Sequence, residues 1–291
     1  MSSPGARLFV LVQRILPKYL LTAVTHRLAR IRIVAIKDFL IRQFVNWYKV
    51  EVEDVLRPVP EGFATFNEFF VRELADNARP IDQSASSIVS PVDGTVSAAG
   101  RIDRDLVFQA KGLAYTLADL LATDIADAER YVDGAFATIY LAPYNYHRVH
   151  APRAGRVIAM RYVPGDLYSV NDATVRHLPG LFTRNERLIC HFETDSGPMV
   201  LIFVGAMNVG TINTRWTGDI RPRQRGVVES IDIGRERDEL LVAKGEPIGW
   251  FNMGSTVILL LPPGGCDGFP ELDNARTVRM GQAIGQSIHL R

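Results

Sequence analysis

The sequence predicts an α+β fold in which amphipathic N-terminal helices precede a mainly antiparallel β domain. The first 50 residues combine apolar side chains at helical spacing with basic side chains, and short β-type runs between turns begin near residue 88. The chain shows neither an internal repeat nor a glycine-rich phosphate loop of accepted spacing. Helices followed by a block of strands are typical of α+β proteins.

Composition and charge indicate a folded protein with an uneven charge distribution. The 291 residues are 47% apolar and 22% charged, which excludes a disordered chain. The net charge of +1 gives no reason to expect nucleic acid, yet residues 1–50 carry nine basic side chains and one acid, a net of +8. We therefore expect an anionic membrane surface as a partner. Cys190 and Cys266 form no disulfide or metal-site pattern and favour a reducing, cytoplasmic setting.

The N-terminal segment has the pattern of helices that lie in a membrane interface. Its apolar stripe is flanked by arginines and consists of Leu20, Val24, Leu28 and Ile31. No stretch reaches the roughly 18 uncharged apolar residues that a spanning helix needs, and no secretory cleavage site follows residues 8–12. The alternative is a helix packed on its own domain with a solvated basic face.

The remaining elements follow in order along the chain. Pro58, Pro60 and Gly62 end the helical region, which predicts a division into residues 1–62 and 63–291. The capping-box pattern from Thr65 to Glu68 predicts a short helix, a polar connector covers 77–87, and leucines predict another helix near 117–121. Strands are expected at 134–141, 156–163, 188–193, 199–205, 227–233 and 256–261.

The segment around Gly254-Ser255-Thr256 places a hydroxyl at a tight turn before an apolar run. Gly254 lacks a Cβ, so its carbonyl is open to close approach and its backbone can be strained. A serine after such a carbonyl can perform an N-to-O acyl shift when a base is supplied. A plain Gly-Ser turn explains the same residues.

Two further segments supply groups for acid–base chemistry. His147 and His150 lie three residues apart after an apolar strand, and histidine is the natural general base near neutral pH. Asp93 precedes Gly94 in a Pro-Val-Asp-Gly segment and could orient a histidine. The alternatives are two partly exposed histidines at a strand end and an ordinary turn. Spacing alone does not bring these residues together.

The combination of motifs resembles bacterial phosphatidylserine decarboxylase proenzymes. Met253-Gly254-Ser255-Thr256 is similar to the Leu-Gly-Ser-Thr self-cleavage motif of that family, with Met253 in place of the usual leucine. The segment from Tyr146 to His150 resembles its histidine-pair motif, and the segment from Pro91 to Gly94 its aspartate motif. Phe69-Phe70-Val71-Arg72 and Ala78-Arg79-Pro80 are also similar. The resemblance runs from about residue 60 to 262.

The resemblance implies two reactions. In the first, His150, oriented by Asp93, removes the Ser255 proton, and the chain cleaves itself into a β chain of residues 1–254 and an α chain of 255–291. Ser255 becomes an N-terminal pyruvoyl group, the only cofactor implied. In the second, this group forms a Schiff base with phosphatidylserine, CO2 leaves, and His147 donates a proton to yield phosphatidylethanolamine. The family also implies a homodimer, and the basic front end places the enzyme at the cytoplasmic face of the cell membrane as a peripheral or monotopic protein.

Two competing functions remain open at this point. A pyruvoyl decarboxylase of a soluble amino acid would share the chemistry, but the N-terminal membrane pattern argues against it. A membrane-associated β-domain binding module would keep Gly254-Ser255 as a plain turn. A denaturing gel distinguishes the module, which migrates as one chain, from a processed enzyme, which gives two.

Overall fold

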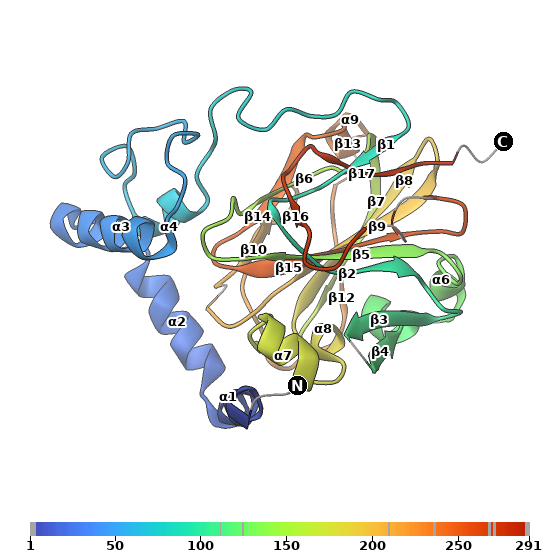
Figure 1. Ribbon diagram of the computed structural model, residues 1–291, viewed down its shortest axis with the longest axis horizontal. Helices are drawn as coiled ribbons and strands as arrows, with labels where there is room; N and C mark the ends of the chain where they lie inside the picture. The colour runs from blue at the N-terminus through green and yellow to red at the C-terminus, as the bar shows by residue number, and fades with distance from the viewer. Residues whose placement is uncertain are drawn as a thin grey trace.

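N-terminal helices stand beside a β domain, so the predicted α+β class is confirmed (Figure 1). The computed structural model describes residues 4–110, 112–123, 125–208, 210–234, 237–266, 269 and 272–288. The helices on one side of the molecule are α1 (Pro4–Ile15), α2 (Lys18–Leu28), α3 (Val34–Tyr48) and the short α4 (Phe66–Phe70).

Helix α4 begins where the capping pattern predicts it. The Thr65 hydroxyl accepts a hydrogen bond from the Glu68 backbone N–H at 3.1 Å, whereas the Glu68 carboxylate accepts from the N–H of Ala64, one residue earlier than in an ideal capping box. A phenylalanine cluster on and before α4 packs against Ile41 of α3 and consists of Phe63, Phe66, Phe69 and Phe70. This small core joins both sides of the predicted boundary at residue 62, and the boundary itself stays a prediction.

Within the described residues, the largest sheet has nine strands in the order β12-β7-β8-β9-β15-β5-β2-β16, with β13 also paired to β7. Every pairing in it is antiparallel. All six predicted strands are present as parts of this sheet. Its strands are β2 (Gly94–Arg101), β5 (Ala135–Leu141), β7 (Gly155–Val163), β8 (Arg187–Thr194), β9 (Gly197–Val204), β12 (Glu229–Ile231), β13 (Leu241–Val242), β15 (Ser255–Leu261) and β16 (Thr277–Val278).

Strand β15 lies inside this sheet between β9 and β5, and all seven of its residues are buried. Its continuous apolar run therefore belongs to the main core. Strand β2 is absent from the sequence prediction because its alanine, glycine and serine residues have little intrinsic strand preference, and pairing with β5 forms it.

Smaller elements complete the β domain. One sheet has the order β11-β10-β14-β6, and two hairpin-sized sheets pair β1 with β17 and β3 with β4. The predicted helix near 117–121 is present as α5 (Leu117–Leu121), with its leucines buried. The other bounds are β1 (Ser87–Val89), β3 (Leu106–Ala110), β4 (Leu113–Thr116), β6 (Arg148–His150), β10 (Ile212–Thr214), β11 (Gly218–Ile220), β14 (Pro247–Phe251), β17 (Ala283–Gln286), α6 (Ile125–Glu129), α7 (Asp172–His177), α8 (Leu181–Arg184) and α9 (Arg237–Leu240).

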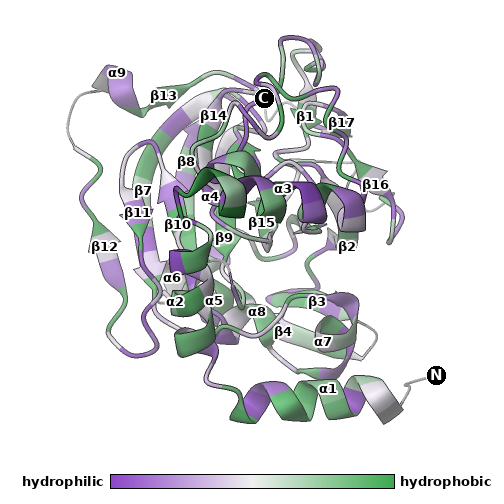
Figure 2. Ribbon diagram, turned by 90° about the vertical axis from the view of Figure 1, so that its left-hand side faces the viewer, coloured by the Kyte–Doolittle hydropathy of each residue, from purple (hydrophilic) through white to green (hydrophobic). Residues whose placement is uncertain are grey.

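The apolar stripe on α2 points away from the β domain. Leu20, Val24 and Leu28 are 61%, 43% and 52% exposed, whereas Lys18 and Thr22 form the buried side of the helix. Figure 2 views the helical face of the molecule and shows hydrophobic stretches on both α1 and α2. Ile31 differs from the prediction, because α2 ends at Leu28 and Ile31 lies beyond the helix.

Polar contacts attach α1 and α2 to the β domain. The Gln13 side chain donates to the Thr174 hydroxyl at 3.0 Å and accepts from the Ser169 N–H at 2.8 Å, while Lys18 pairs with Asp166 at 3.0 Å. In the described part of the chain, no single helix has the length and apolarity to cross a membrane. The consecutive segments Gly5–Ile15 and Lys18–Leu28 meet these criteria only as a pair, and they are bent by 85° at their junction.

Candidate active site

Ser255 is the first residue of β15, and its hydroxyl is buried. Its Oγ has no hydrogen-bond partner in the described part of the molecule. A buried hydroxyl without a partner is unfavourable, and such groups cluster where chemistry is done. Gly254 does not adopt the left-handed backbone that favours glycine, so the strain permitted by the sequence is not found in that form. A methyl group at its Cβ position would meet only ordinary contacts, at 3.5 Å or more.

His147 lies beside Gly254. Its Nε2 is 3.7 Å from the Cβ position of Gly254, is buried and has no hydrogen-bond partner among the described residues. Nδ1 is 2.8 Å from the Asn145 carbonyl oxygen, an arrangement in which Nδ1 carries the proton and Nε2 is the free acceptor. Burial and, to a smaller extent, the Arg72 charge lower the pKa of His147 to about 3. His147 is therefore neutral at physiological pH, close to the Gly254-Ser255 bond.

His150 is engaged at both ring nitrogens. Nε2 is 3.0 Å from the Tyr146 hydroxyl, and Nδ1 is 2.8 Å from the Gly245 carbonyl oxygen. Burial lowers the pKa of His150, and the Arg148 charge adds to this effect. The hydrogen bond to Gly245 and the charge of Asp93 act in the opposite direction. Strand pairing places His150 opposite Pro247 of β14, on the chain that leads to Gly254.

Asp93 binds an arginine rather than a histidine in this structure. Its two carboxylate oxygens accept hydrogen bonds from Arg79 at 2.7–3.0 Å, and Oδ1 also accepts from the Met280 N–H at 2.8 Å. The resemblance implies that Asp93 orients His150, but no hydrogen bond joins these two described residues. The Asp93 carboxylate forms its ion pair with the guanidinium of Arg79 at 2.7 Å. Its influence on His150 is that of a nearby negative charge.

Strand register brings Asp93 and Ser255 to one edge of the large sheet, and His147 lies near this edge. Tyr140 of β5 lies opposite Thr95 of β2 on one side and Thr256 of β15 on the other. Asp93 and Ser255, 162 positions apart, therefore flank the end of the same strand. His147 follows β5 by six residues and turns back over this edge. His150 lies in β6 of the smaller four-stranded sheet, and its N–H donates to the Pro91 carbonyl at 2.8 Å, two residues before Asp93.

Arg72 is a site residue that sequence reasoning quoted in a motif but gave no role. It is 3% exposed, and its Nη2 donates to the Tyr144 carbonyl at 3.1 Å, on the loop that carries His147. Nε and Nη1 have no hydrogen-bond partner in the described residues. Burial lowers the pKa of Arg72 to about 10, so it remains charged at neutral pH. Only the tertiary structure shows this buried cation next to His147.

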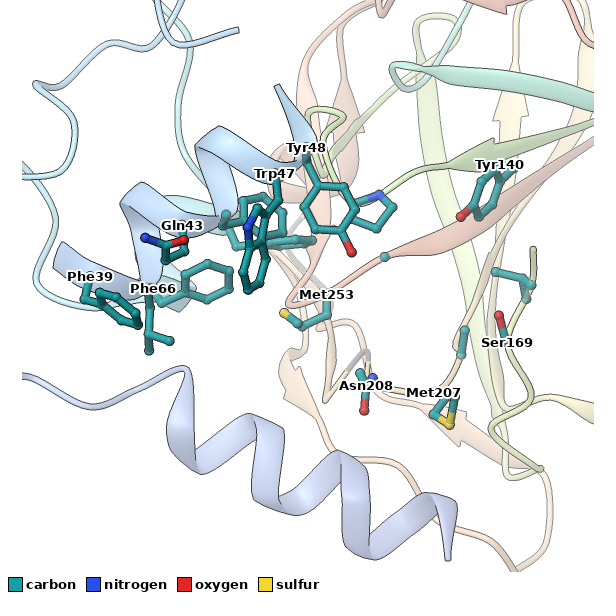
Figure 3. Close-up of a pocket in the computed structure, with 17 residues that line it drawn as sticks. Phe39, Gln43, Trp47, Tyr48, Phe66, Tyr140, Ser169, Met207, Asn208 and Met253 are labelled. Atoms are coloured by element: carbon teal, nitrogen blue, oxygen red, sulfur yellow. The ribbon is translucent and has the colours of Figure 1, made fainter. Parts of the chain in front are cut away.

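A cavity of about 410 Å³ opens beside Gly254 (Figure 3). Phe39, Trp47 and Tyr48 of α3 line one side of it, and Met207 lines another. Met253 projects between these groups, and its neighbour Gly254 also lines the cavity. The lining is mostly apolar, so the cavity suits the apolar part of a ligand whose reactive end reaches Ser255. The sequence did not predict these lining residues, which come from segments far apart in the chain.

The chain is similar to known proteins over most of its length. A family model described as phosphatidylserine decarboxylase matches residues 66–286, and a second, described as PSD, matches residues 8–49. The chain is 44% identical over 279 residues to a phosphatidylserine decarboxylase proenzyme of Saccharophagus degradans, covering 96% of this chain and 97% of the relative. It is 47% identical over 279 residues to the proenzyme of that name from Chromobacterium violaceum, covering 96% and 98%.

Proposed function

Because the chain belongs to the phosphatidylserine decarboxylase family, we propose that it converts phosphatidylserine to phosphatidylethanolamine and CO2 in phospholipid biosynthesis. The observation that carries the proposal is the buried, unpartnered Ser255 hydroxyl after Gly254, with the unpartnered Nε2 of His147 beside Gly254. A plain turn would not require a sealed hydroxyl next to an unpartnered imidazole nitrogen.

The first step is self-cleavage between Gly254 and Ser255. The Ser255 oxygen attacks the Gly254 carbonyl carbon and the amide nitrogen leaves it, so that an ester replaces the peptide bond. Removal of the Ser255 α-proton then expels the Gly254 carboxylate and leaves dehydroalanine. Tautomerisation and reaction with water release ammonia and leave a pyruvoyl group at the start of the α chain. The β chain ends at Gly254.

The two histidines differ in base strength and in position. Burial lowers the pKa of both histidines. At His150 the hydrogen bond to Gly245 and the charge of Asp93 oppose this lowering, while the Arg148 charge adds to it. At His147 the Arg72 charge adds to the lowering, and the pKa falls to about 3. We assign His150 as the base that removes the Ser255 proton on this difference. Its Nε2 becomes available when the hydrogen bond to the Tyr146 hydroxyl breaks. His147, closer to the bond, delivers the proton that replaces CO2. This assignment accords with the resemblance, while proximity in the uncleaved chain favours His147.

The residues around Ser255 fit a pyruvoyl group at this position. Ser255 pairs with Leu141 of β5, and its neighbour Thr256 pairs with both β5 and β9. The Ser255 hydroxyl has no competing hydrogen bond in the described residues, so strand pairing would fix the position of the group. The pyruvoyl group supplies an electron sink for the electrons released with CO2. Arg72, buried beside His147, would hold an anionic part of the substrate headgroup through its two unpartnered nitrogens.

Membrane association explains how a water-insoluble substrate reaches this site. The exposed stripe of α2 and the exposed Phe39 and Trp47 of α3 lie on the helical side, where the apolar cavity is lined by α3. We place the protein as a peripheral or monotopic enzyme at the cytoplasmic face of the membrane. The homodimer implied by the resemblance stays a prediction.

Mass spectrometry combined with an activity assay tests the proposal. The purified protein should give two chains that divide at Gly254-Ser255, with the α chain carrying a pyruvoyl group, and it should release CO2 from phosphatidylserine vesicles. Ser255→Ala should remain one inactive chain. A single-chain wild-type protein that binds vesicles without releasing CO2 would support a binding module, and release from free serine alone would support a soluble decarboxylase.

A further inference from the structure

A second cavity lies between α2 and the segment around Pro222, away from the site at Ser255. It measures about 550 Å³ and shares no lining residue with the cavity beside Gly254. Its basic lining consists of His26, Arg27, Arg30 and Arg221. We call it the α2 basic cavity. Its size is within the range of small-ligand sites.

The positive charge of this cavity is not balanced within the described structure. The single nearby acid, Asp219, lies 3.9 Å from Arg30, and its other oxygen accepts from the Asn213 side chain at 2.8 Å. Neither Arg27 nor Arg221 forms an ion pair or a side-chain hydrogen bond with another described residue. Three guanidinium groups against one carboxylate leave a net charge of +2, before any contribution from His26.

The basic side chains around this cavity are close enough to repel one another. Burial lowers the pKa of His26, and the charges of Arg30, Arg221 and Arg27 lower it further. Burial also lowers the pKa of Arg30; the charge of Asp219 opposes this effect and that of Arg221 adds to it. Like charges held together around a cavity are unfavourable unless an anion binds between them. The arrangement is that of an anion site.

The cavity adjoins the exposed apolar stripe of α2. Arg27 is three residues after Val24 and seven after Leu20, so helical geometry places all three along one side of α2. An anion bound at Arg27 could therefore continue into apolar chains that run along Leu20 and Val24. A phospholipid has this combination of charge and chains, whereas an inorganic ion has only the charge.

The opposite wall of the cavity connects to the pocket at Gly254. Gly210 lines the α2 basic cavity, while Asn208 lines the pocket beside Gly254. The Asn208 N–H donates to the Thr22 hydroxyl of α2 at 3.1 Å. A ligand on α2 therefore lies next to the segment that shapes the substrate pocket.

We propose that the α2 basic cavity binds the phosphodiester headgroup of an anionic membrane phospholipid, separate from the lipid molecule that is decarboxylated. Guanidinium groups bind phosphate oxygens through paired hydrogen bonds, and three of them surround this space. The inference rests on the membrane association within the proposed function. It does not depend on the chemistry at Ser255.

The test compares two double variants that remove equal charge. The first variant, Arg27→Gln with Arg221→Gln, removes two guanidinium groups that line the cavity. The second, Arg14→Gln with Arg32→Gln, removes two exposed arginines elsewhere in the basic N-terminal region. Monomeric dihexanoylphosphatidylglycerol is titrated into each full-length protein while the His26 ring is followed by NMR. Dihexanoylphosphatidylcholine and inorganic phosphate serve as separate probes.

We expect saturable phosphatidylglycerol binding in the parent and the Arg14/Arg32 variant. Binding in the Arg27/Arg221 variant should be at least about tenfold weaker, because two charged donors to the phosphate are lost. Lysine at both cavity positions should restore part of the binding, because it keeps the charge but not the paired geometry. Equal weakening in both double variants would show general surface attraction and overturn the site. Inorganic phosphate binding as tightly as the lipid would overturn the lipid assignment.

Decarboxylation of detergent-dispersed phosphatidylserine separates this inference from the proposed function. Both double variants should mature and release CO2 at the parental rate, because neither changes a residue at Ser255. A parent protein that fails to release CO2 would refute the proposed function, while the phosphatidylglycerol titration would still decide the anion site.

Discussion

Strand β15 and helix α2 use similar apolar residues in opposite ways. Leu259 and its neighbours in β15 are fully buried between two strands, whereas Leu20 and Leu28 of α2 are more than half exposed. In β15 the apolar side chains stabilise the fold, and they seal the Ser255 hydroxyl from water. In α2 they contribute little to the fold and remain available to lipid. The difference shows that an apolar segment is not always part of the core. Whether its apolar side chains face the rest of the protein or the solvent decides their role.

The largest expected effects concern the two histidines at the sealed end of β15. His150→Ala should block maturation, since a missing general base slows proton transfer by about 10²–10⁴-fold. His147→Ala should retain substantial cleavage but lose decarboxylation. Asp93→Asn should slow cleavage, because it removes the charge that supports His150. Gel analysis of cleavage and CO2 release measure these outcomes separately.

The reverse pattern has a clear meaning. If His147→Ala blocks cleavage while His150→Ala matures normally, proximity to Gly254 outweighs base strength and the two assignments are exchanged. Circular dichroism serves as a control for Asp93→Asn, because Asp93 also binds Arg79 and the Met280 N–H.

A matched pair of leucine truncations tests the comparison itself. Leu259→Ala should lower the free energy of unfolding by about 2–5 kcal/mol, because it leaves a cavity in the core. Leu20→Ala should change it by no more than about 0.5 kcal/mol, since the side chain is 61% exposed. Urea denaturation of both variants in the Ser255→Ala background keeps the chain uncleaved. Comparable losses in the two variants would mean that α2 packs its stripe inside the folded protein.

The stripe of α2 should matter for membrane attachment instead. Replacing Leu20, Val24, Leu28 and Ile31 by serine should make binding to anionic liposomes mostly reversible by salt, because only the screened electrostatic part remains. Activity on vesicles should fall more than activity on detergent-dispersed substrate. Liposome flotation at low and high salt measures the effect. A quadruple variant that floats like the parent at high salt would contradict an apolar anchor on α2.

Acid sensitivity gives the smallest expected effect. The pKa of His147 falls from its ordinary 6.5 to about 3 on burial, so below pH 6.5 the unfolded chain binds a proton that the folded chain does not. Stability therefore decreases as pH falls from about 6.5 towards 3. In the Ser255→Ala background, His147→Gln should reduce the acid-induced loss at pH 5 by about 2 kcal/mol, with no such gain at pH 8. Urea denaturation at the two pH values measures it, and an equal acid loss in both proteins would refute a buried neutral His147.

Local sequence determined the elements whose signals are short-range. The apolar run of β15, the Thr65 cap of α4 and the leucines of α5 each depend on neighbours within a few residues, and the structure confirms all three elements. The stripe of α2 was also visible as spacing, although the helix ends before Ile31. The candidate residues at Ser255, His147, His150 and Asp93 came from motifs, and their catalytic roles stay predictions.

Only the tertiary structure decided how those residues meet. Strand order sets Asp93 and Ser255 on either side of β5, and it gives Asp93 to Arg79 instead of to His150. The packing of the helices leaves the stripe of α2 exposed, and Arg72 is buried next to His147. The physical reason is that strand order, register and helix docking follow from the packing of the whole chain. Periodicity within a segment records which face is apolar, but it does not record what that face meets.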